Sequence, residues 1–161
     1  MIGNDIVDLA LAKNPSNWKR KGYLDKIFTV SEQLLIQKST NQELAIWNLW
    51  SRKEAVYKII LQKGGNRGYY PTKIECLDLN LENGIVQFEK QIFHTKTIVT
   101  GDSVYSIAVE NVSDIQNVKT LENSHLLFKV DGIPFISINN EVKNASKTHH
   151  GNFERIVYLD A

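Results

Sequence analysis

The chain lacks the features that mark several protein classes. Its 161 residues include one cysteine, three prolines and nine glycines, which excludes a disulfide scaffold, a collagen-like repeat and a Pro/Gly-rich disordered chain. Lys plus Arg total 19 against 18 Asp plus Glu, a net charge of +1, so an overall basic field for nucleic acid is absent. No run approaches the roughly 18 apolar residues that cross a bilayer, and residues 1–8 carry two aspartates and no basic run, unlike a secretory signal. We expect one cytoplasmic domain over 1–161, without nucleic-acid or membrane partners.

Hydrophobic patterning in the first third predicts a strand followed by helices. The strand is expected at Ile2–Leu9. The capping-box pattern, a hydroxyl followed three residues later by glutamate, occurs at Thr29 and at Thr40 and predicts two helix starts. The second helix should run over 41–63 and end at the two glycines that follow, because glycine accepts left-handed dihedral angles.

Beyond Pro71 the pattern changes to a period of two, which is typical of strands. Asn83-Gly84 predicts the turn of a hairpin. Further strands are expected at 91–100, 104–110, 125–130, 133–138 and 156–159, and the polar stretch 111–123 is expected to be a loop. No internal repeat is apparent. The pattern as a whole indicates an α+β fold, with helices first and then a largely antiparallel sheet.

The predicted long helix is apolar around most of its circumference and carries one narrow polar stripe. Its members are Asn48, Ser51, Glu54, Lys58 and Gln62. One interpretation is a solvated stripe with an i,i+4 ion pair between Glu54 and Lys58, which stabilises a helix by about 0.2–0.5 kcal/mol. The other is a carboxylate and an ammonium that point into a cleft, one holding a cation and the other a phosphate.

Several isolated residues have more than one interpretation. Asp5 lies in an apolar strand, so it should be exposed at the strand end, paired, or bound to a metal, whereas Asp8 on the opposite face predicts a cap or a turn. Cys76 is expected to be a small buried hydrophobic residue. His149-His150 is either a surface turn or part of a site. Zinc is disfavoured because only two other histidines exist and the cysteine has no partner at ligand spacing.

Two segments together resemble the signature motifs of the 4′-phosphopantetheinyl transferase superfamily: Ile2–Leu9 and Trp50–Lys58. The family pattern is a glycine-x-aspartate strand and, tens of residues later, an aromatic-small-x-Lys-Glu-Ala-x-x-Lys helix. Gly132-Ile133-Pro134 and the segment from Ser146 to His149 are similar to the family's Gly-x-Pro and Ser-x-x-His elements. Their order is that of the small, holo-acyl-carrier-protein synthase type. The middle, 70–125, shows no clear alignment.

The resemblance implies a 4′-phosphopantetheinyl transferase-like α+β fold and a set of site residues. Asp5 and Glu54 match the carboxylates that bind Mg²⁺, a cation that prefers hard oxygen ligands. Lys58 matches the lysine that neutralises phosphate. Lys53 matches the first signature lysine, with a contact to a nucleotide phosphate, although it lies off the polar stripe. His149 matches the histidine that meets the nucleotide end of coenzyme A.

The implied reaction is transfer of 4′-phosphopantetheine from coenzyme A to a serine of an apo acyl or peptidyl carrier protein. Adenosine 3′,5′-bisphosphate is released, and Glu54 or a metal-bound water accepts the serine proton. Ser146 would help to bind coenzyme A, and His150 could substitute for His149. Carrier proteins of this family are acidic, so a basic cluster is expected to meet them: Lys13, Lys19, Arg20 and Lys21.

Two alternatives stay open from the sequence. One is a non-catalytic relative that binds coenzyme A or a carrier protein, and the other is an unrelated α+β binding module in which Asp5 lies far from Glu54. In the small type the active site lies between identical subunits, so a second copy should complete the cleft unless the long middle segment covers it. Two residues depart from family patterns: Val7, where large-type enzymes often place a third acid, and Ile133, where lysine is frequent.

Overall fold

The computed structural model describes residues 1–13 and 17–160. In this part of the chain the α-helices are α1 (Leu9–Lys13), α2 (Tyr23–Ile27), α3 (Val30–Lys38) and α4 (Gln42–Gln62). Short 3-10 helices lie at Pro71–Lys73, Val112–Asn117 and Ser124–Leu126. The helices gather in the first half, as the sequence pattern predicts.

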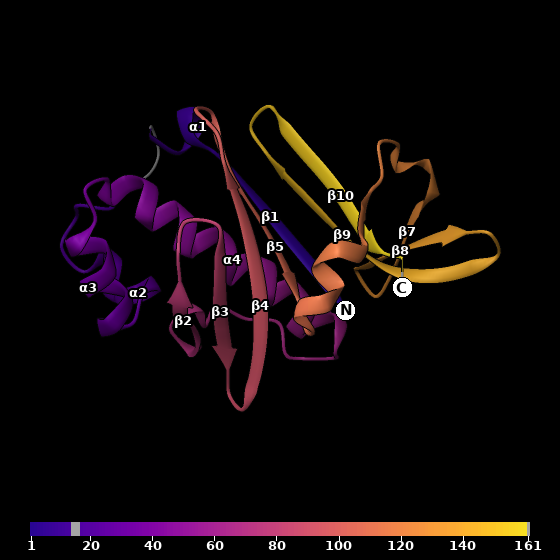
Figure 1. Ribbon diagram of the computed structural model, residues 1–161, viewed down its shortest axis with the longest axis horizontal. Helices are drawn as coiled ribbons and strands as arrows, with labels where there is room; N and C mark the ends of the chain where they lie inside the picture. The colour runs from indigo at the N-terminus through magenta and orange to yellow at the C-terminus, as the bar shows by residue number, and fades with distance from the viewer. Residues whose placement is uncertain (14–16, 161) are drawn as a thin grey trace.

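The strands form two antiparallel sheets. The first has the order β1-β5-β4-β3-β2, and the second has the order β6-β10-β9-β8-β7. The strands of the first sheet are β1 (Ile2–Asp8), β2 (Ile74–Leu79), β3 (Asn83–Phe88), β4 (Gln91–Val99) and β5 (Ser103–Val109). Those of the second are β6 (Val118–Thr120), β7 (Leu127–Val130), β8 (Ile133–Ile138), β9 (Glu141–His150) and β10 (Phe153–Leu159). In Figure 1, α4 crosses behind the first sheet, and the second sheet lies beyond β1 on the opposite side from α2 and α3. The α+β prediction is confirmed.

The helix starts follow side-chain capping. Thr29 and Glu32 form the predicted capping box at the start of α3, with both reciprocal hydrogen bonds present. The prediction at Thr40 is wrong, because Asn41 is the N-cap of α4 and its Oδ1 accepts the Leu44 N–H at 3.0 Å. An asparagine one residue later serves the same purpose as the hydroxyl. α4 ends at Gln62, close to the glycines as predicted, and Gly64 has a left-handed φ of +82°.

The hairpin turn between β2 and β3 lies earlier than predicted. Asn80 Oδ1 accepts the N–H groups of Glu82 and Asn83, at 2.9 and 2.8 Å. Gly84 lies inside β3, where it pairs with Thr95. An Asx turn at Asn80 therefore closes the hairpin, and the Asn83-Gly84 prediction is wrong because the asparagine side chain competes successfully for these donors.

The other strands lie close to their expected positions, with one omission. β4, β5 and β8 match within a residue, β10 begins at Phe153, and the expected loop 111–123 contains a short 3-10 helix and β6. β9 was not predicted because its sequence, Glu-Val-Lys-Asn-Ala-Ser-Lys-Thr-His-His, has no apolar alternation. Its buried residues are Ala145, Ser146 and Thr148, so the strand buries mainly polar side chains.

The two sheets contain the same three-stranded meander. β8, β9 and β10 each begin 50 residues after β3, β4 and β5, respectively. The first turns match as well, since Glu89 and Asn139 both have positive φ, 55° and 52°. When each residue of 83–109 is compared with the residue 50 positions later, the amino acid is the same only at Gly101 and Gly151. The repeat is therefore one of structure, which explains why the sequence pattern did not reveal it.

The core lies between α4 and the first sheet. Ala55, Val56 and Ile59 of α4 are fully buried, and β1 crosses the helix at Gly3. A Cβ built on Gly3 would lie 1.8 Å from the Ala55 carbonyl oxygen, so only glycine permits this approach. The close crossing places residue 5 of the strand beside the polar stripe of the helix.

Candidate active site

Asp5 and Glu54 face one cavity. Asp5 lies on β1, Glu54 lies on α4, and both line a cavity of about 190 Å³. The remaining lining residues are Ile6, Val7, Ala12, Trp47, Trp50, His149 and His150. Glu54 and Trp50 also line a second cavity of about 240 Å³, with Tyr57 and Tyr69. The two acids thus share a cleft that continues past Glu54, and the alternative in which Asp5 lies far from Glu54 is wrong.

Lys58 joins three elements at this site. Its Nζ lies 3.5 Å from Asp5 Oδ1 and donates hydrogen bonds to the carbonyl oxygens of Asn4 at 2.5 Å and Lys147 at 3.2 Å. The side chains of Lys58 and Asp5 are 26% and 14% exposed. Lys58 is therefore the cation of the site and also a bridge from α4 to β1 and β9.

Burial shifts the protonation of all three groups. Burial raises the pKa of Asp5, although Lys58 opposes the shift, and burial lowers the pKa of Lys58. Burial and then the nearby Asp5 raise the pKa of Glu54 to about 7. Two partly buried carboxylates with one lysine between them form an environment that favours a further cation.

The donor set fits a hard divalent cation that keeps ligands from water or substrate. Among the described residues no group of three or more His, Cys, Asp or Glu side chains could hold a metal. Asp5 and Glu54 together offer carboxylate oxygens only. Mg²⁺ typically binds one or two carboxylates and keeps waters or substrate phosphates as further ligands.

Lys53 lines the cavity beyond Glu54, but core groups hold its ammonium, so the predicted contact with a nucleotide phosphate is not supported. Its side chain is 1% exposed and its Nζ lies 2.6 Å from Glu32 Oε2. The same Nζ donates to the carbonyl oxygens of Ile27 and Pro71, at 3.0 and 2.9 Å. Its three donors are therefore used within the core, which leaves none for a nucleotide phosphate. Glu32 is a structural residue, since it caps α3 and also accepts the Cys76 N–H at 2.8 Å.

The histidine segment forms the end of β9 and lies against β1. Ser146 is 1% exposed, accepts the Asn4 N–H at 3.0 Å and donates to Asn4 Oδ1 at 2.7 Å. Ser146 is therefore a contact to β1 and has no exposed hydroxyl for coenzyme A. His150 Nδ1 accepts the Asp8 N–H at 2.8 Å, and His149 is exposed at the cavity edge.

Two isolated predictions are confirmed. Asp8 Oδ1 accepts the N–H groups of Ala10 and Leu11, each at 3.1 Å, and so caps α1. Cys76 is buried and free, and burial raises the pKa of its thiol, which leaves it unreactive.

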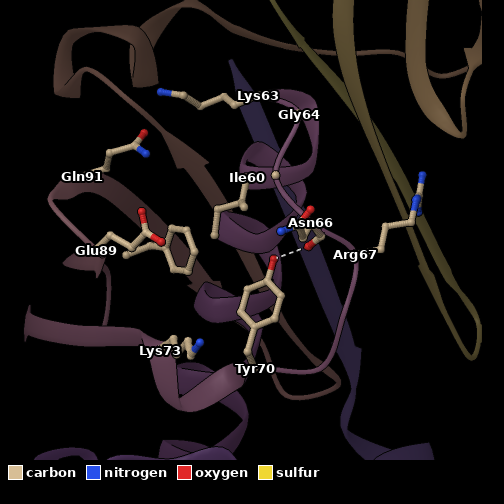
Figure 2. A pocket seen from close by; sticks show the side chains of 11 residues that line it. Ile60, Lys63, Gly64, Asn66, Arg67, Tyr70, Lys73, Glu89 and Gln91 are labelled. Carbon is tan, nitrogen blue, oxygen red and sulfur yellow. Dashed lines mark hydrogen bonds between the residues drawn. The ribbon is translucent and has the colours of Figure 1, made fainter.

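A cavity of about 470 Å³ lies away from the acidic pair, at the C-terminal end of α4. Figure 2 shows its basic side chains, Lys63, Arg67 and Lys73, around Tyr70. Lys63 pairs with Glu110, and Arg67 donates to the Asp131 carbonyl oxygen at 2.9 Å. Neither acid of the pair lines this cavity, so its size does not make it the site.

The four residues of the expected basic cluster lie on the surface. Lys13 ends α1, and Lys19, Arg20 and Lys21 precede α2. All four side chains are exposed, and Lys19 lies over the ring of Trp18. Among the described residues no helix has both the length and the apolar character needed to span a membrane.

The geometry defines an α+β protein with an acidic pair and a lysine in one cleft. A model of the 4′-phosphopantetheinyl transferase superfamily matches residues 1–110. The chain therefore belongs to this superfamily, and its activity class is phosphopantetheinyl transfer. The match includes 70–110, which the motifs left unaligned, and does not extend to the Gly132 and Ser146 elements. No curated protein matches the chain in sequence.

Solved structures share the fold. The Helicobacter pylori holo-[acyl-carrier-protein] synthase, in complex with coenzyme A, has a TM-score of 0.55 and 19% identity, over 69% of this chain and 100% of that one. The Neisseria meningitidis holo-[acyl-carrier-protein] synthase has a TM-score of 0.56 and 18% identity, over 68% of this chain and 96% of that one. The Thermotoga maritima enzyme has 0.52 and 18%, over 78% of each chain.

The sequence did not identify Thr148 as part of the site. Thr148 Oγ1 donates to Asp5 Oδ1 at 3.1 Å and accepts the Ile6 N–H at 3.2 Å. The available signal was the alternation of polar side chains at 146, 148 and 150, which is typical of a strand whose polar face meets another backbone.

Proposed function

We propose that this chain is a Mg²⁺-dependent holo-acyl-carrier-protein synthase-type enzyme. It would transfer 4′-phosphopantetheine from coenzyme A to a serine of an apo carrier protein. The observation that carries this proposal is the shared cavity of Asp5 and Glu54, with Lys58 3.5 Å from Asp5. Transfer from a pyrophosphate needs charge neutralisation and alignment more than covalent help from the protein.

Asp5 and Glu54 would hold the Mg²⁺, which when bound neutralises and orients the pyrophosphate of coenzyme A. A cation at Asp5 would weaken the electrostatic attraction between Asp5 and Lys58, and the ammonium of Lys58 could then pair with a phosphate oxygen. His149, exposed at the edge of the same cavity, is the residue we assign to the nucleotide end. Lys53 and Ser146 have no part in this assignment, because their polar atoms are already used.

In the proposed reaction the serine oxygen forms a bond to phosphorus and the bond to the adenosine 3′,5′-bisphosphate leaving group breaks. A carboxylate has two oxygens, so Glu54 can hold a cation with one and receive the serine proton with the other. We assign the exposed residues Lys13, Lys19, Arg20 and Lys21 to the contact with an acidic carrier protein, because opposite charges steer such partners together.

The direct test is to incubate the protein with coenzyme A, Mg²⁺ and a series of apo carrier proteins, and to measure the intact mass of each carrier. We expect a phosphopantetheine adduct that requires Mg²⁺ and is lost with a chelator. If coenzyme A binds but no carrier gains the adduct, the alternative of a non-catalytic relative would replace this proposal.

A further inference from the structure

β9 covers the open edge of β1 with side chains instead of backbone. β1 lies at the edge of its sheet, so the N–H groups of Asn4, Ile6 and Asp8 lack a neighbouring strand. Ser146 Oγ, Thr148 Oγ1 and His150 Nδ1 accept them at 3.0, 3.2 and 2.8 Å, respectively. Every second residue of β9 thus meets every second residue of β1. Buried backbone donors are satisfied in this way without a ladder.

Thr148 is the member of this series that contacts the acidic pair. It is 5% exposed, and its hydroxyl accepts from Ile6 N–H while donating to Asp5 Oδ1 at 3.1 Å. A hydroxyl has one proton to donate, so accepting from the backbone directs that proton to Asp5. Asp5 Oδ1 is then held by Thr148 and Lys58, and this fixes the orientation of a carboxylate that lines the cavity.

The strand that supplies Thr148 lies outside the family match, which ends at residue 110. The Helicobacter pylori chain is covered completely by 69% of this one. β9 belongs to the second meander, which lies outside the residues of the family match. Its contacts nevertheless fix the strand that carries Asp5.

We propose that Thr148 is a positioning residue for Asp5, and that the second sheet is consequently part of the catalytic unit. The proposal rests on the proposed function for its consequence in catalysis, but its structural content is the orientation of the Asp5 carboxylate toward a cation. Loss of groups that orient metal ligands typically reduces metal affinity 10- to 100-fold.

The test compares Thr148→Val, which removes the hydroxyl at nearly constant volume, with Thr148→Ser, which retains it. We expect Thr148→Val to raise the Mg²⁺ concentration for half-maximal transfer by about 10- to 100-fold, with a much smaller change in KM for coenzyme A. Thr148→Ser should recover most of this loss. Calorimetric titration of each protein with Mg²⁺ alone should give the same order of affinities.

Thr97→Val is the matched control. Thr97 is 1% exposed and its hydroxyl shares a 2.7 Å hydrogen bond with Ser106, so the control also removes a buried hydroxyl from a strand. It should lower stability without moving the Mg²⁺ dependence. Thr148→Ala, which leaves room for water at the Ile6 N–H, replaces Thr148→Val if that variant does not fold.

An unchanged Mg²⁺ affinity in Thr148→Val or Thr148→Ala would overturn the positioning role, as would an equal shift in Thr97→Val. Failure of the proposed function would look different: the wild-type protein would transfer nothing to any carrier. The calorimetric series would still decide the role of Thr148 in that case.

Discussion

Two lysines of α4, five residues apart, have opposite environments. Lys53 is buried against Glu32 at 2.6 Å, and Lys58 lies at the cleft beside Asp5. On a helix a five-residue step rotates a side chain by about 140° away from its starting direction. The two signature lysines therefore cannot face the same phosphate, and Lys53 stabilises the helix's position in the core.

We expect Lys53→Met to destabilise the protein by about 3–5 kcal/mol, because it leaves the buried Glu32 without its cation. Urea denaturation measures this loss. Lys63→Met, at the C-cap of the same helix, is the control, since Lys63 forms a partly exposed pair with Glu110 and its loss should cost about 0–1 kcal/mol. The KM for coenzyme A of folded Lys53→Met should equal that of the wild type. A raised KM with wild-type stability would return Lys53 to the binding site.

The raised pKa of Glu54 predicts that the free energy of unfolding depends on pH. Its pKa is raised from 4.5 to about 7, so in the folded state it ionises later than in the unfolded chain. The associated stability is complete below pH 4.5 and is lost as the pH rises through about 7. Glu54→Gln cannot ionise, so relative to the wild type it should gain on the order of 1–3 kcal/mol between pH 5 and pH 8. Urea denaturation at both values, with a chelator present, measures the difference.

Glu54→Gln should also lose transfer activity by about 100-fold, the upper end of the loss that is typical of a damaged metal site. At limiting Mg²⁺, wild-type transfer should fall as the pH drops through about 7, because protons then compete with the cation for Glu54. Gln62→Glu offers no substitute acid, since Gln62 already binds both backbone groups of Ile2. Retention of full activity by Glu54→Gln would refute the metal assignment.

At the scale of elements, the contact between β1 and α4 sets the geometry of the acidic pair. Gly3 lets the strand lie on the helix at Ala55. Gly3 is two residues before Asp5 on the strand, and Ala55 directly follows Glu54 on the helix. Strand and helix periodicities then bring both acids to one cavity. The glycine of the signature motif is thus required by the backbone approach, and the aspartate depends on it.

We expect Gly3→Ala to destabilise the protein by about 3 kcal/mol, since its Cβ would overlap a backbone oxygen that cannot move aside. For a chain of this size the Tm should fall by roughly 6–12 °C. Gly101→Ala is the control: no atom of the described residues lies within 4 Å of its built Cβ, and the Tm should be nearly unchanged. Equal Tm values for the two variants would contradict the close-approach argument.

The elements that the sequence predicted correctly are those stabilised locally. The capping box at Thr29, the glycine stop after α4 and the alternating strands β4, β5 and β8 all depend on neighbours in the chain. β9 was missed because its burial comes from polar contacts with β1, whose residues lie 142 positions earlier in the chain, and no local pattern records such a partner. Asp5 and Glu54 were assigned as cation ligands through the resemblance to the family's two motifs, whereas the contact of Thr148 with Asp5 requires the tertiary structure.

At the scale of the whole molecule, the second meander occupies the position that a second chain could otherwise take along β1. The first sheet uses one edge of β1 through β5, and the second sheet uses the other through β9. Both turns contact the end of β1, although in opposite directions: Leu9 N–H donates to the Asp102 carbonyl oxygen at 2.9 Å, and Asp8 Oδ2 accepts the Asn152 N–H at 3.2 Å. β1 therefore lies between two copies of one supersecondary unit (Figure 1).

This arrangement predicts that one chain holds one complete site. His149 of the second sheet lines the cavity of Asp5 and Glu54, and the edge of β1 has no unpaired donor among Asn4, Ile6 and Asp8 to offer a partner. Specific activity should therefore stay constant over a dilution series of about three orders of magnitude, because no subunit equilibrium contributes to the site. Sedimentation at the lowest and highest concentrations provides the matching control. A specific activity that falls with dilution, together with a shift to a smaller species, would mean that a second copy completes the cleft after all.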